Sequence, residues 1–546
     1  MIALGGLQEI GKNITIFEYG NDILIADCGV AFPDDDLLGI DLVIPDFSYL
    51  QENEKKIRGL VLTHGHEDHI GSIPFLLKKV NIPVIFGTPL TTGLVQNRLK
   101  EHGITANIKN VKKGDTVGIG CFKVEFINVN HSIADACALA INTPVGMVLH
   151  TGDFKIDYTP IESETMDLQR FAELGKQGVK LLLCESTNVE HKGFTMSERS
   201  VGEIIRNIFN ESKKQRLMIA TFSSNIHRIQ HIIQSAKVQR RKVCILGRSM
   251  INAIRTAREL GYINCNDDLF IEPKHLGEYK PEKTVIIMTG SQGEPMSALS
   301  RIASSDHRQV DILEGDKIVI SASPIPGNEK LVSRVINELL RKGADVIYEG
   351  VMDIHVSGHA KQEEIKIVHN LVQPEFFMPV HGEYRHLKTH KELAKSLGMK
   401  NNKIFLMNNG DVLEIDKKGA KMTGVVQAGR VFVDGMGVGD VGNVVLRDRK
   451  LLSEDGLMIV VLGIQKSTKT LVAGPDIITR GFVYVRESEA LLIEAKEVAS
   501  NIVDGVSMSE MRDWNLLKNL VRDGMRDFLW KKTKRSPMIL PIVMEI

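Results

Sequence analysis

The chain has 546 residues, which is too long for one compact core and predicts roughly three or four domains. Hydrophobic residues make up 43% of it and charged residues 25%, as in ordinary globular proteins. No stretch approaches the ~20 apolar residues that a membrane span needs, so we expect no such span. Basic and acidic residues number 68 each, so any surface that binds a polyanion must be a local one.

The N-terminus has no basic segment followed by an apolar one, so we expect no signal peptide and a cytoplasmic location. In a reducing compartment a disulfide framework is not expected. No CxxC pair occurs, which argues against a zinc site made of thiolates. The cysteines concerned are Cys28, Cys121, Cys137, Cys184, Cys244 and Cys265.

The first part of the chain alternates short apolar runs with loops. Such runs, rich in Val, Ile and Leu, are typical of strands in a covered sheet. A helix is predicted over 70–80, packed on that sheet. The predicted strand segments are 22–29, 57–64, 122–131 and 146–153, and each reaches a His or an Asp in a turn.

From about residue 198 to 350 amphipathic helices alternate with apolar strands, which predicts a separate α/β domain with a parallel sheet. Short strands and loops that include His355, His359 and His381 follow, and residues 433–450 are rich in glycine. The last module, about 456–546, combines strands with two helices. It carries a basic segment, KKTKR at 531–535, which is either a solvated face or an RNA-backbone contact.

The strongest chemical signal is THGHEDHIG at 63–71. His64 and His66 lie directly after a predicted strand, so their side chains can converge on one metal ion. Asp68 and His69 can reach a second position. Imidazole and carboxylate ligands suit Zn²⁺, with Mn²⁺ as the alternative where carboxylates dominate.

Three more residues of ligand type end predicted strands. His131 and Asp153 each terminate one, and His381 follows the strand FFMPV. Ligands at the same end of several strands can meet in one cleft. The residues therefore predict a two-metal site assembled from distant parts of the chain.

HGHEDH is the signature of the metallo-β-lactamase fold, and the later motifs narrow the resemblance. The chain resembles the β-CASP nucleases, most closely bacterial ribonuclease J, over nearly its whole length. The order of the motifs carries this resemblance: NHSIAD (130–135), TGDFKID (151–157), ESTN (185–188), GRSM (247–250), GSQGEPMSALSR (290–301), SASPIPGNE (321–329), HVSGHA (355–360), PVHGEY (379–384) and GPDIITRGFVYVRESE (474–489).

The resemblance implies an α/β chain: a metallo-β-lactamase αββα sandwich with an inserted α/β β-CASP domain and a small α+β C-terminal domain. The implied boundaries are 1–197 and 351–446 for the two parts of the metallo-β-lactamase domain, 198–350 for the β-CASP domain, 447–465 for a linker, and 466–546 for the C-terminal domain.

Carried over residue by residue, the resemblance assigns His64, His66 and His131 to one metal. It assigns Asp68, His69 and His381 to the other, with Asp153 bridging both. The implied catalytic residues are Asp68, Glu185 and His359. Glu185, where many ribonuclease J sequences have Asp, would orient a ligand histidine through its other ring nitrogen. His359 would contact the scissile phosphate.

Other loops resemble substrate-contacting loops of the family, although ordinary strand-end turns explain such Ser and Asn residues as well. The implied substrate-binding residues are Ser224, Asn225, Ile226, Ser321, Ser323, His355, Val356, Ser357, Gly358 and His359. A structural divalent cation, Ca²⁺, is implied at Leu38, Ile40 and Asp434. The acidic run 34–36 is an alternative cation attractor.

The resemblance implies two-metal hydrolysis of RNA with two Zn²⁺ per subunit, leaving 5′-phosphate products. It implies 5′-to-3′ exonuclease and endonuclease activity on single-stranded RNA with a preference for a 5′-monophosphate, in messenger decay and ribosomal RNA maturation. The working form would be a homodimer, a tetramer or a mixed complex with a paralogue.

Three alternatives stay open at the level of sequence. A small-molecule metallo-hydrolase would not need the inserted domain. A DNA-directed β-CASP nuclease is disfavoured by His381, which such relatives tend to lack. A non-catalytic partner subunit or RNA-binding scaffold would be expected to lose motif residues, whereas all are present here.

Overall fold

The structure is a computed structural model, and it describes residues 1–34, 36–161, 164–294, 296–324, 328–435, 437–468, 470–483, 488–507 and 513–546. The remaining residues include parts of five segments singled out above (34–36, 290–301, 321–329, 433–450 and 474–489), and those parts lie outside the described residues. The chain divides into two compact units. One comprises 1–32 and 42–431, and the other 33–41 and 432–546.

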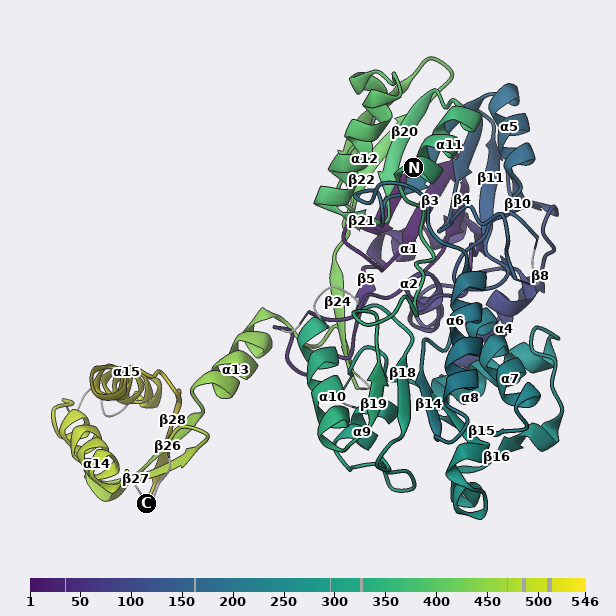
Figure 1. Cartoon of the computed structure of the whole chain (residues 1–546). Coiled ribbons are helices and arrows are strands. Elements are labelled where there is room, and N and C mark those ends of the chain that lie inside the picture. The colour runs from purple at the N-terminus through teal and green to yellow at the C-terminus, as the bar shows by residue number, and fades with distance from the viewer. Residues whose placement is uncertain are drawn as a thin grey trace. The chain divides into compact units, whose positions relative to one another are not determined.

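Two facing β-sheets form the centre of the first unit (Figure 1). The eight-stranded sheet has the order β23-β22-β1-β3-β4-β6-β7-β8, and the six-stranded sheet has the order β20-β13-β12-β11-β10-β9. The strands of the first are β1 (Ile2–Gly5), β3 (Ile14–Tyr19), β4 (Asp22–Ala26), β6 (Ile57–Val61), β7 (Ile85–Gly87), β8 (Ile108–Asn110), β22 (Asp411–Ile415) and β23 (Ala420–Val425). Those of the second are β9 (Thr116–Ile119), β10 (Phe122–Asn128), β11 (Cys137–Thr143), β12 (Gly146–His150), β13 (Val179–Glu185) and β20 (Phe376–Val380).

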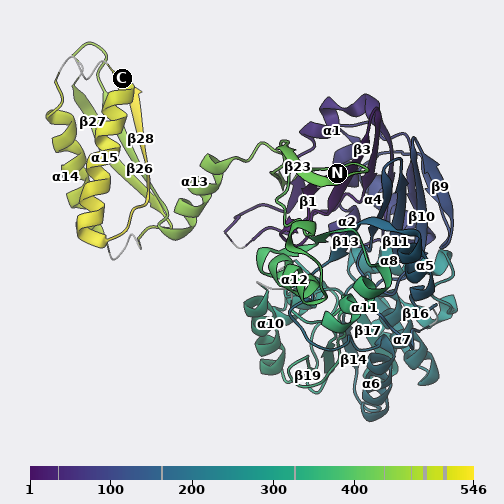
Figure 2. The same cartoon turned by 90° about the horizontal axis from the view of Figure 1, so that it is seen from above.

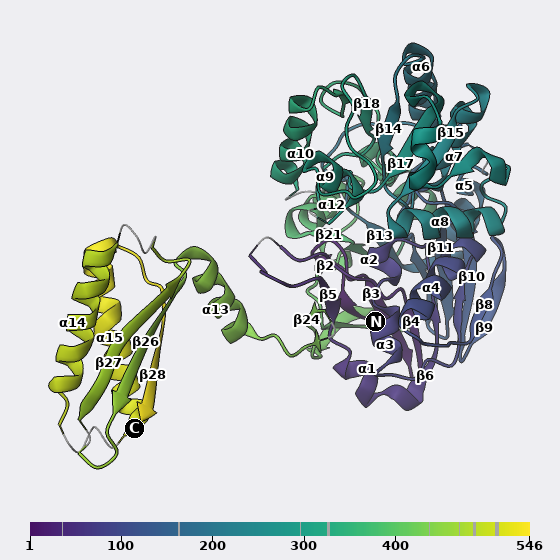
Figure 3. The ribbon, with the colours of Figure 1, turned by 90° about the horizontal axis from the view of Figure 1, so that it is seen from below.

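The sandwich core lies between these sheets. Because side chains alternate along a strand, one set, including Leu24, Phe126 and Leu181, fills the space between the sheets. The opposite set, including Ile127 and Leu182, packs under outer helices. These helices are α5 (Leu168–Gln177), α11 (Gln362–Val372) and α12 (Tyr384–Ser396) on the six-stranded sheet (Figure 1). Helices α1 (Ser48–Glu52), α3 (Ile73–Leu77) and α4 (Pro89–Glu101) lie beside the other sheet (Figure 3).

This layering confirms the predicted αββα sandwich. The helix predicted over 70–80 is shorter than expected. Residues 67–77 form two short helices, α2 (Glu67–Ile70) and α3, and Lys78 ends the second. The four ligand-type residues at 64–69 occupy the turn before and within α2, and the chain bends after them.

The inserted domain lies in the chain between β13 and α11 and has a parallel six-stranded sheet of order β16-β15-β17-β14-β18-β19. Helices α6, α7 and α8 contribute to the core on one face, and α9 and α10 to the core on the other. The elements are α6 (Glu198–Glu211), β14 (Leu217–Ala220), α7 (Ile226–Val238), β15 (Lys242–Leu246), α8 (Arg248–Glu259), β16 (Phe270–Ile271), β17 (Thr284–Met288), α9 (Ala298–Ala303), β18 (Lys317–Ile320), α10 (Glu329–Arg341) and β19 (Asp345–Ile347).

Helix α6 illustrates why this sequence forms an amphipathic helix. Ser197 is its N-cap, and the Ser197 side chain accepts a hydrogen bond from the Arg199 amide. Val201, Ile205 and Ile208 recur at helical spacing and are buried against the sheet. This core also includes Leu90, Ile133 and Ala134, so the inserted domain packs on the sandwich through it, while the core on the opposite face of the sheet belongs to the inserted domain alone.

In the second unit two helices pack on a three-stranded sheet of order β27-β26-β28 (Figure 2). Its elements are α13 (Asn443–Glu454), β26 (Leu457–Ile464), β27 (Leu471–Arg480), α14 (Glu489–Asp504), α15 (Trp514–Thr533) and β28 (Met538–Glu545). We predicted a linker over 447–465. The structure instead places the end of α13 and β26 there. The backbone of β26 pairs with both neighbouring strands, and its alternate side chains Met458, Val460 and Leu462 are buried in the core with the helices. Among the described helices, none has the length and apolar composition that crossing a bilayer requires.

Candidate metal centre and active site

The structure brings all seven predicted ligands together. They lie in the segments that follow β6, β10, β12 and β20, so strands of both sheets deliver them to one place. The first group is His64, His66 and His131, and the second is Asp68, His69, Asp153 and His381. Within each group the ligand atoms lie within 4.8 Å of one another.

The first group has the spacing of a tetrahedral cation site. His66 Nδ1 lies 3.1 Å from His64 Nε2 and 3.1 Å from His131 Nε2. Ligands about 2.0–2.1 Å from a tetrahedral Zn²⁺ are separated by roughly 3.3 Å. The three ring nitrogens therefore fit a common metal ion.

Asp153 touches both groups. Its Oδ2 lies 3.7 Å from His64 Nε2, 3.9 Å from His131 Nε2 and 3.2 Å from His69 Nε2. Its Oδ1 lies 2.7 Å from His381 Nδ1. Because one carboxylate contacts ligands of both groups, Asp153 occupies the position expected of a bridging ligand.

Asp68 completes the second group. Its Oδ2 lies 3.5 Å from His69 Nε2 and 3.3 Å from His381 Nε2. His381 adopts a left-handed backbone conformation, with φ of 52°. Such a conformation is uncommon for residues other than glycine and here aims the His381 ring back toward the two carboxylates.

In three of the five ligand histidines, the protein holds the ring nitrogen that faces away from the ligand group. His69 Nδ1 donates to Asp27 at 2.8 Å, and His131 Nδ1 donates to the Gly358 carbonyl at 2.7 Å. The Thr63 hydroxyl donates to Asp27 at 2.8 Å, so at 3.0 Å it must accept from His64 Nδ1. These contacts leave the Nε2 atoms available to a cation, as in metalloenzymes.

The electrostatics agree with a cation site. Burial lowers the pKa of His64 and His131 well below the usual value and that of His66 to about 4, so these rings are neutral ligands. Burial opposes ionisation of Asp68, but His69 and His381 hold the Asp68 pKa well below its usual value. Neutral imidazoles of the first group and ionised carboxylates of the second suit divalent metals. The carboxylates raise the pKa of His69 and His381, so a cation bound at the second group would replace the protons of those two rings.

Gly358 is required by close approach. A Cβ atom there would lie 2.6 Å from Ser132 Oγ and 2.7 Å from the His131 ring. Only glycine lets the 355–359 backbone reach His131 and accept its hydrogen bond.

Glu185 and His359 form a pair beside the metal ligands. Glu185 Oε2 lies 2.8 Å from His359 Nδ1, and Glu185 Oε1 accepts from the Phe154 amide at 2.8 Å. The sequence led us to expect that Glu185 orients a ligand histidine, whereas in the structure its partner is His359. Burial works against protonation, but the Glu185 and Asp153 carboxylates raise the pKa of His359. The His359 Nδ1 atom lies 3.9 Å from Asp153 Oδ2, so the ring stands beside the metal ligands.

The loop that carries His359 is fastened by its neighbours. Ser357 Oγ accepts from the His359 amide at 3.1 Å and from Asn188 Nδ2 at 2.8 Å. Thr195 Oγ1 donates to the His359 carbonyl at 2.7 Å. The loop therefore holds His359 in a fixed position.

Several predicted substrate-binding side chains have structural partners. Ile226 and Val356 are buried in the core of the inserted domain. Asn225 caps α7, and Ser321 Oγ donates to the Ile354 carbonyl at 2.6 Å. These four side chains face protein atoms, while Ser224, Ser323, His355 and Ser357 are half-buried.

Several residues that support the metal ligands or the 355–359 loop were not predicted from the sequence. Asp27 accepts from His69 and from Thr63, and Asn13 Nδ2 lies 3.1 Å from His69 Nε2. Arg228 is fully buried near the 355–359 loop. Asp27 had a sequence signal, since it ends a strand as the ligands do. The segments containing Asn13 and Arg228 offered none.

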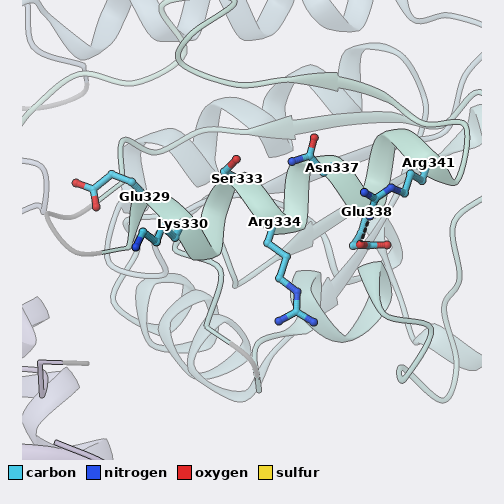
Figure 4. Close-up of a pocket in the computed structure, with 7 residues that line it drawn as sticks. All are labelled: Glu329, Lys330, Ser333, Arg334, Asn337, Glu338 and Arg341. Carbon is cyan, nitrogen blue, oxygen red and sulfur yellow. Dashed lines mark hydrogen bonds and ion pairs between the residues drawn. The ribbon is translucent and has the colours of Figure 1, made fainter. Parts of the chain in front are cut away.

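At the predicted structural cation position, within the second unit, the Arg449 guanidinium pairs with the Asp434 carboxylate and donates to the Leu38 carbonyl at 2.9 Å. Two of the three groups expected to bind a cation, the Asp434 carboxylate and the Leu38 carbonyl, thus already contact a positive group. A separate, open hollow of about 460 Å³ lies on the outer side of α10 (Figure 4). The predicted site residues do not line it.

Comparison with known proteins agrees with this architecture. Residues 8–157 match the metallo-beta-lactamase superfamily, and 214–339 match the ribonuclease J beta-CASP domain. Residues 343–406 match a Zn-dependent metallo-hydrolase RNA specificity domain, and 444–546 match the ribonuclease J C-terminal domain.

Relatives match over the full length. The chain is 44% identical to ribonuclease J2 of Bacillus subtilis, covering 100% of this chain and 98% of that protein. It is 44% identical to ribonuclease J 1 of Streptococcus pyogenes (100% and 97% covered) and 43% identical to ribonuclease J of Synechocystis (99% and 86%).

A solved structure from Enterococcus faecalis V583, described as a protein of unknown function, shares the fold, with a TM-score of 0.54 at 16% identity over 77% of this chain and 99% of that one. The full-length matches, the order of the matched domains and the convergence of His and Asp ligands show that this chain belongs to the ribonuclease J family and is a metal-binding hydrolase.

Proposed function

We propose that this chain is a two-metal ribonuclease that hydrolyses phosphodiester bonds of single-stranded RNA. The observation that carries the proposal is the convergence of seven His and Asp side chains into two ligand groups that share Asp153. The full-length relatives named ribonuclease J support RNA as the substrate.

The proposed metals are two Zn²⁺ per subunit, with Mn²⁺ as the alternative. His64, His66 and His131 would hold one, Asp68, His69 and His381 the other, and Asp153 both. When bound, two such ions supply an activated water and neutralise charge on the reacting phosphate. Cleavage of the bond between phosphorus and the 3′ oxygen would leave a 5′-phosphate on the downstream product.

The chain's own residues orient the reacting groups. Glu185 holds the His359 ring through Nδ1, so Nε2–H remains to donate to a phosphate or leaving oxygen. Neighbouring Ser357 is tied to Asn188 and to the His359 amide, which fixes the loop. Preorganised donors of this kind lower the barrier because they need not reorient during reaction.

We further propose 5′-to-3′ exonuclease activity favouring a 5′-monophosphate, together with endonuclease activity, in messenger decay and ribosomal RNA maturation. A cytoplasmic location and assembly as a homodimer, tetramer or mixed complex with a paralogue belong to the same proposal.

Ca²⁺ at Leu38, Ile40 and Asp434 would have to displace Arg449. Calcium should therefore raise the unfolding temperature only if it outcompetes that guanidinium.

The test is digestion of end-labelled RNA that carries a 5′-monophosphate or a 5′-triphosphate, with and without chelator. We expect progressive 5′-end degradation of the monophosphate substrate, and loss of all cleavage after chelation. Full activity of metal-stripped protein would refute the metal mechanism. Cleavage of DNA, thioesters or β-lactams without cleavage of RNA would refute the substrate assignment.

A further inference from the structure

Arg228, on α7 of the inserted domain, is completely buried and joins three segments beside the 355–359 loop. Its Nε and Nη2 donate to Glu198 Oε1 and Oε2 at 2.7 and 2.9 Å. Its Nη1 donates to the Ser321 carbonyl at 2.7 Å and lies 3.1 Å from His355 Nδ1. One side chain thus connects α6, the end of β18 and the loop that carries His359.

The contact with His355 has only one chemical meaning. A guanidinium is always protonated and has no lone pair to offer, so it can only donate. His355 Nδ1 must therefore be the acceptor, and it cannot carry a proton while this contact exists.

The charges around His355 keep its ring neutral. Burial, the Arg228 cation and Lys155 together lower the pKa of His355 to about 3, although Glu198 opposes them. Glu198 is already engaged by both arms of Arg228. A neutral ring whose Nδ1 accepts must carry its proton on Nε2.

We propose that Arg228 is a positioning residue for substrate recognition: it holds His355 in the tautomer whose Nε2–H donates to a phosphate oxygen of the RNA. This rests on the proposed function and adds a residue that selects which ring nitrogen faces the substrate. Without Arg228 the imidazole could present a lone pair, which repels a phosphate oxygen.

The surrounding contacts favour this role over simple filling of space. The carbonyl of Ser321 accepts from Arg228, and the Ser321 hydroxyl in turn donates to the Ile354 carbonyl, next to His355. Arginine alone offers a planar set of donors for a carboxylate, a carbonyl and an imidazole at once. The loop position and the His355 tautomer therefore depend on the same side chain.

The first experiment observes the ring directly in the unmodified, full-length chain labelled with ¹⁵N-histidine. Nitrogen NMR shifts distinguish protonated from unprotonated ring nitrogens, and the H355Q variant assigns the signal. We expect a neutral His355 with protonated Nε2 throughout the neutral pH range. A proton on Nδ1, or a cationic ring, would overturn the proposal.

The second experiment measures kcat and KM for single-stranded RNA. The double variant E198Q/R228M removes the guanidinium donor together with its carboxylate partner, so neither charge is left buried and unpaired. We expect KM to rise about tenfold, which corresponds to the loss of roughly one hydrogen bond to the substrate. The value of kcat should stay within about twofold of the wild type. In the H355Q background no imidazole tautomer is left for Arg228 to hold, so E198Q/R228M/H355Q should have the same KM as H355Q.

Arg241 supplies the matched control. It is also a buried arginine of the inserted domain, but its partners are the Ser212 and Gln215 carbonyls and the Gln239 side chain. R241M should lower the unfolding temperature and leave KM unchanged. If E198Q/R228M raises KM as much in the H355Q background as in the wild type, or R241M raises KM equally, Arg228 acts only structurally and the proposal fails. If E198Q/R228M does not fold, the NMR result on the unmodified chain decides. Failure of the wild-type chain to cleave RNA would refute the proposed function, and the tautomer measurement would still decide the Arg228–His355 contact.

Discussion

Replacing Asp27 by asparagine tests whether the buried carboxylate behind His69 controls metal affinity. Asp27 is 2% exposed and accepts three hydrogen bonds of 2.8 Å each: from His69 Nδ1, from the Thr63 amide and from the Thr63 hydroxyl. Asparagine keeps one acceptor oxygen and turns the other into an NH₂ group that faces a donor. The Nδ1–H of His69 then loses its partner, or the ring turns and its Nε2 no longer faces the cation.

The magnitude follows from these contacts. A hydrogen bond to a charged group contributes about 1.5–3 kcal/mol. Loss of a carboxylate behind a ligand histidine lowers metal affinity by about 10- to 100-fold. That range corresponds to about 1.4–2.7 kcal/mol, so the two magnitudes agree. We therefore expect the Asp27→Asn variant to bind zinc about 10- to 100-fold more weakly than the wild type.

The assay is competitive titration of metal-stripped protein against a fluorescent zinc chelator. The control is Asp316→Asn, which alters an equally buried carboxylate (2% exposed) that pairs with Arg216 in the inserted domain. It should lower the free energy of unfolding without changing zinc affinity. Zinc binding by Asp27→Asn as tight as that of the wild type would refute the reasoning.

Three further predictions concern the site and its surroundings. Gly358→Ala places a Cβ 2.6 Å from Ser132 Oγ, so we expect about 1–3 kcal/mol of destabilisation in urea unfolding and a large loss of kcat; wild-type kcat would count against the close approach. Glu185→Gln removes the carboxylate that holds His359, so kcat should fall about 10- to 100-fold. The metal content, measured by atomic absorption, should stay at the wild-type level. A loss of metal would mean that Glu185 supports the metal ligands instead. Burial lowers the pKa of His369 to about 4, so the neutral ring is favoured in the folded state and stability falls as pH drops from about 6.5 toward 4. His369→Gln should reduce that fall in metal-free protein, by on the order of 3 kcal/mol in urea unfolding at the two pH values, and an unchanged pH dependence would show that other groups cause it.

Much of the metal centre could be predicted from the sequence because its ligands are marked by local patterns. HGHEDH concentrates four ligand-type residues after a strand, and His131, Asp153 and His381 each follow another apolar run. Strand-end positions imply a shared edge of a sheet, so the spatial convergence followed from the pattern. The helix–strand alternation of 198–350 predicted the parallel sheet, because parallel strands need a crossover connection that is usually a helix.

The contacts that orient these ligands came only from the tertiary structure. His131 donates to the carbonyl of Gly358, 227 positions later, and Arg228 meets His355 127 positions later. Glu185 contacts His359 rather than a ligand histidine, and the Arg449 guanidinium lies where a metal cation was expected. Sequence alone determined which side chains can bind metal, because ligand chemistry belongs to the residue type. The partners of the opposite ring nitrogens depend on which loops the packed sheets and the inserted domain bring within about 3 Å, and no local pattern encodes that distance.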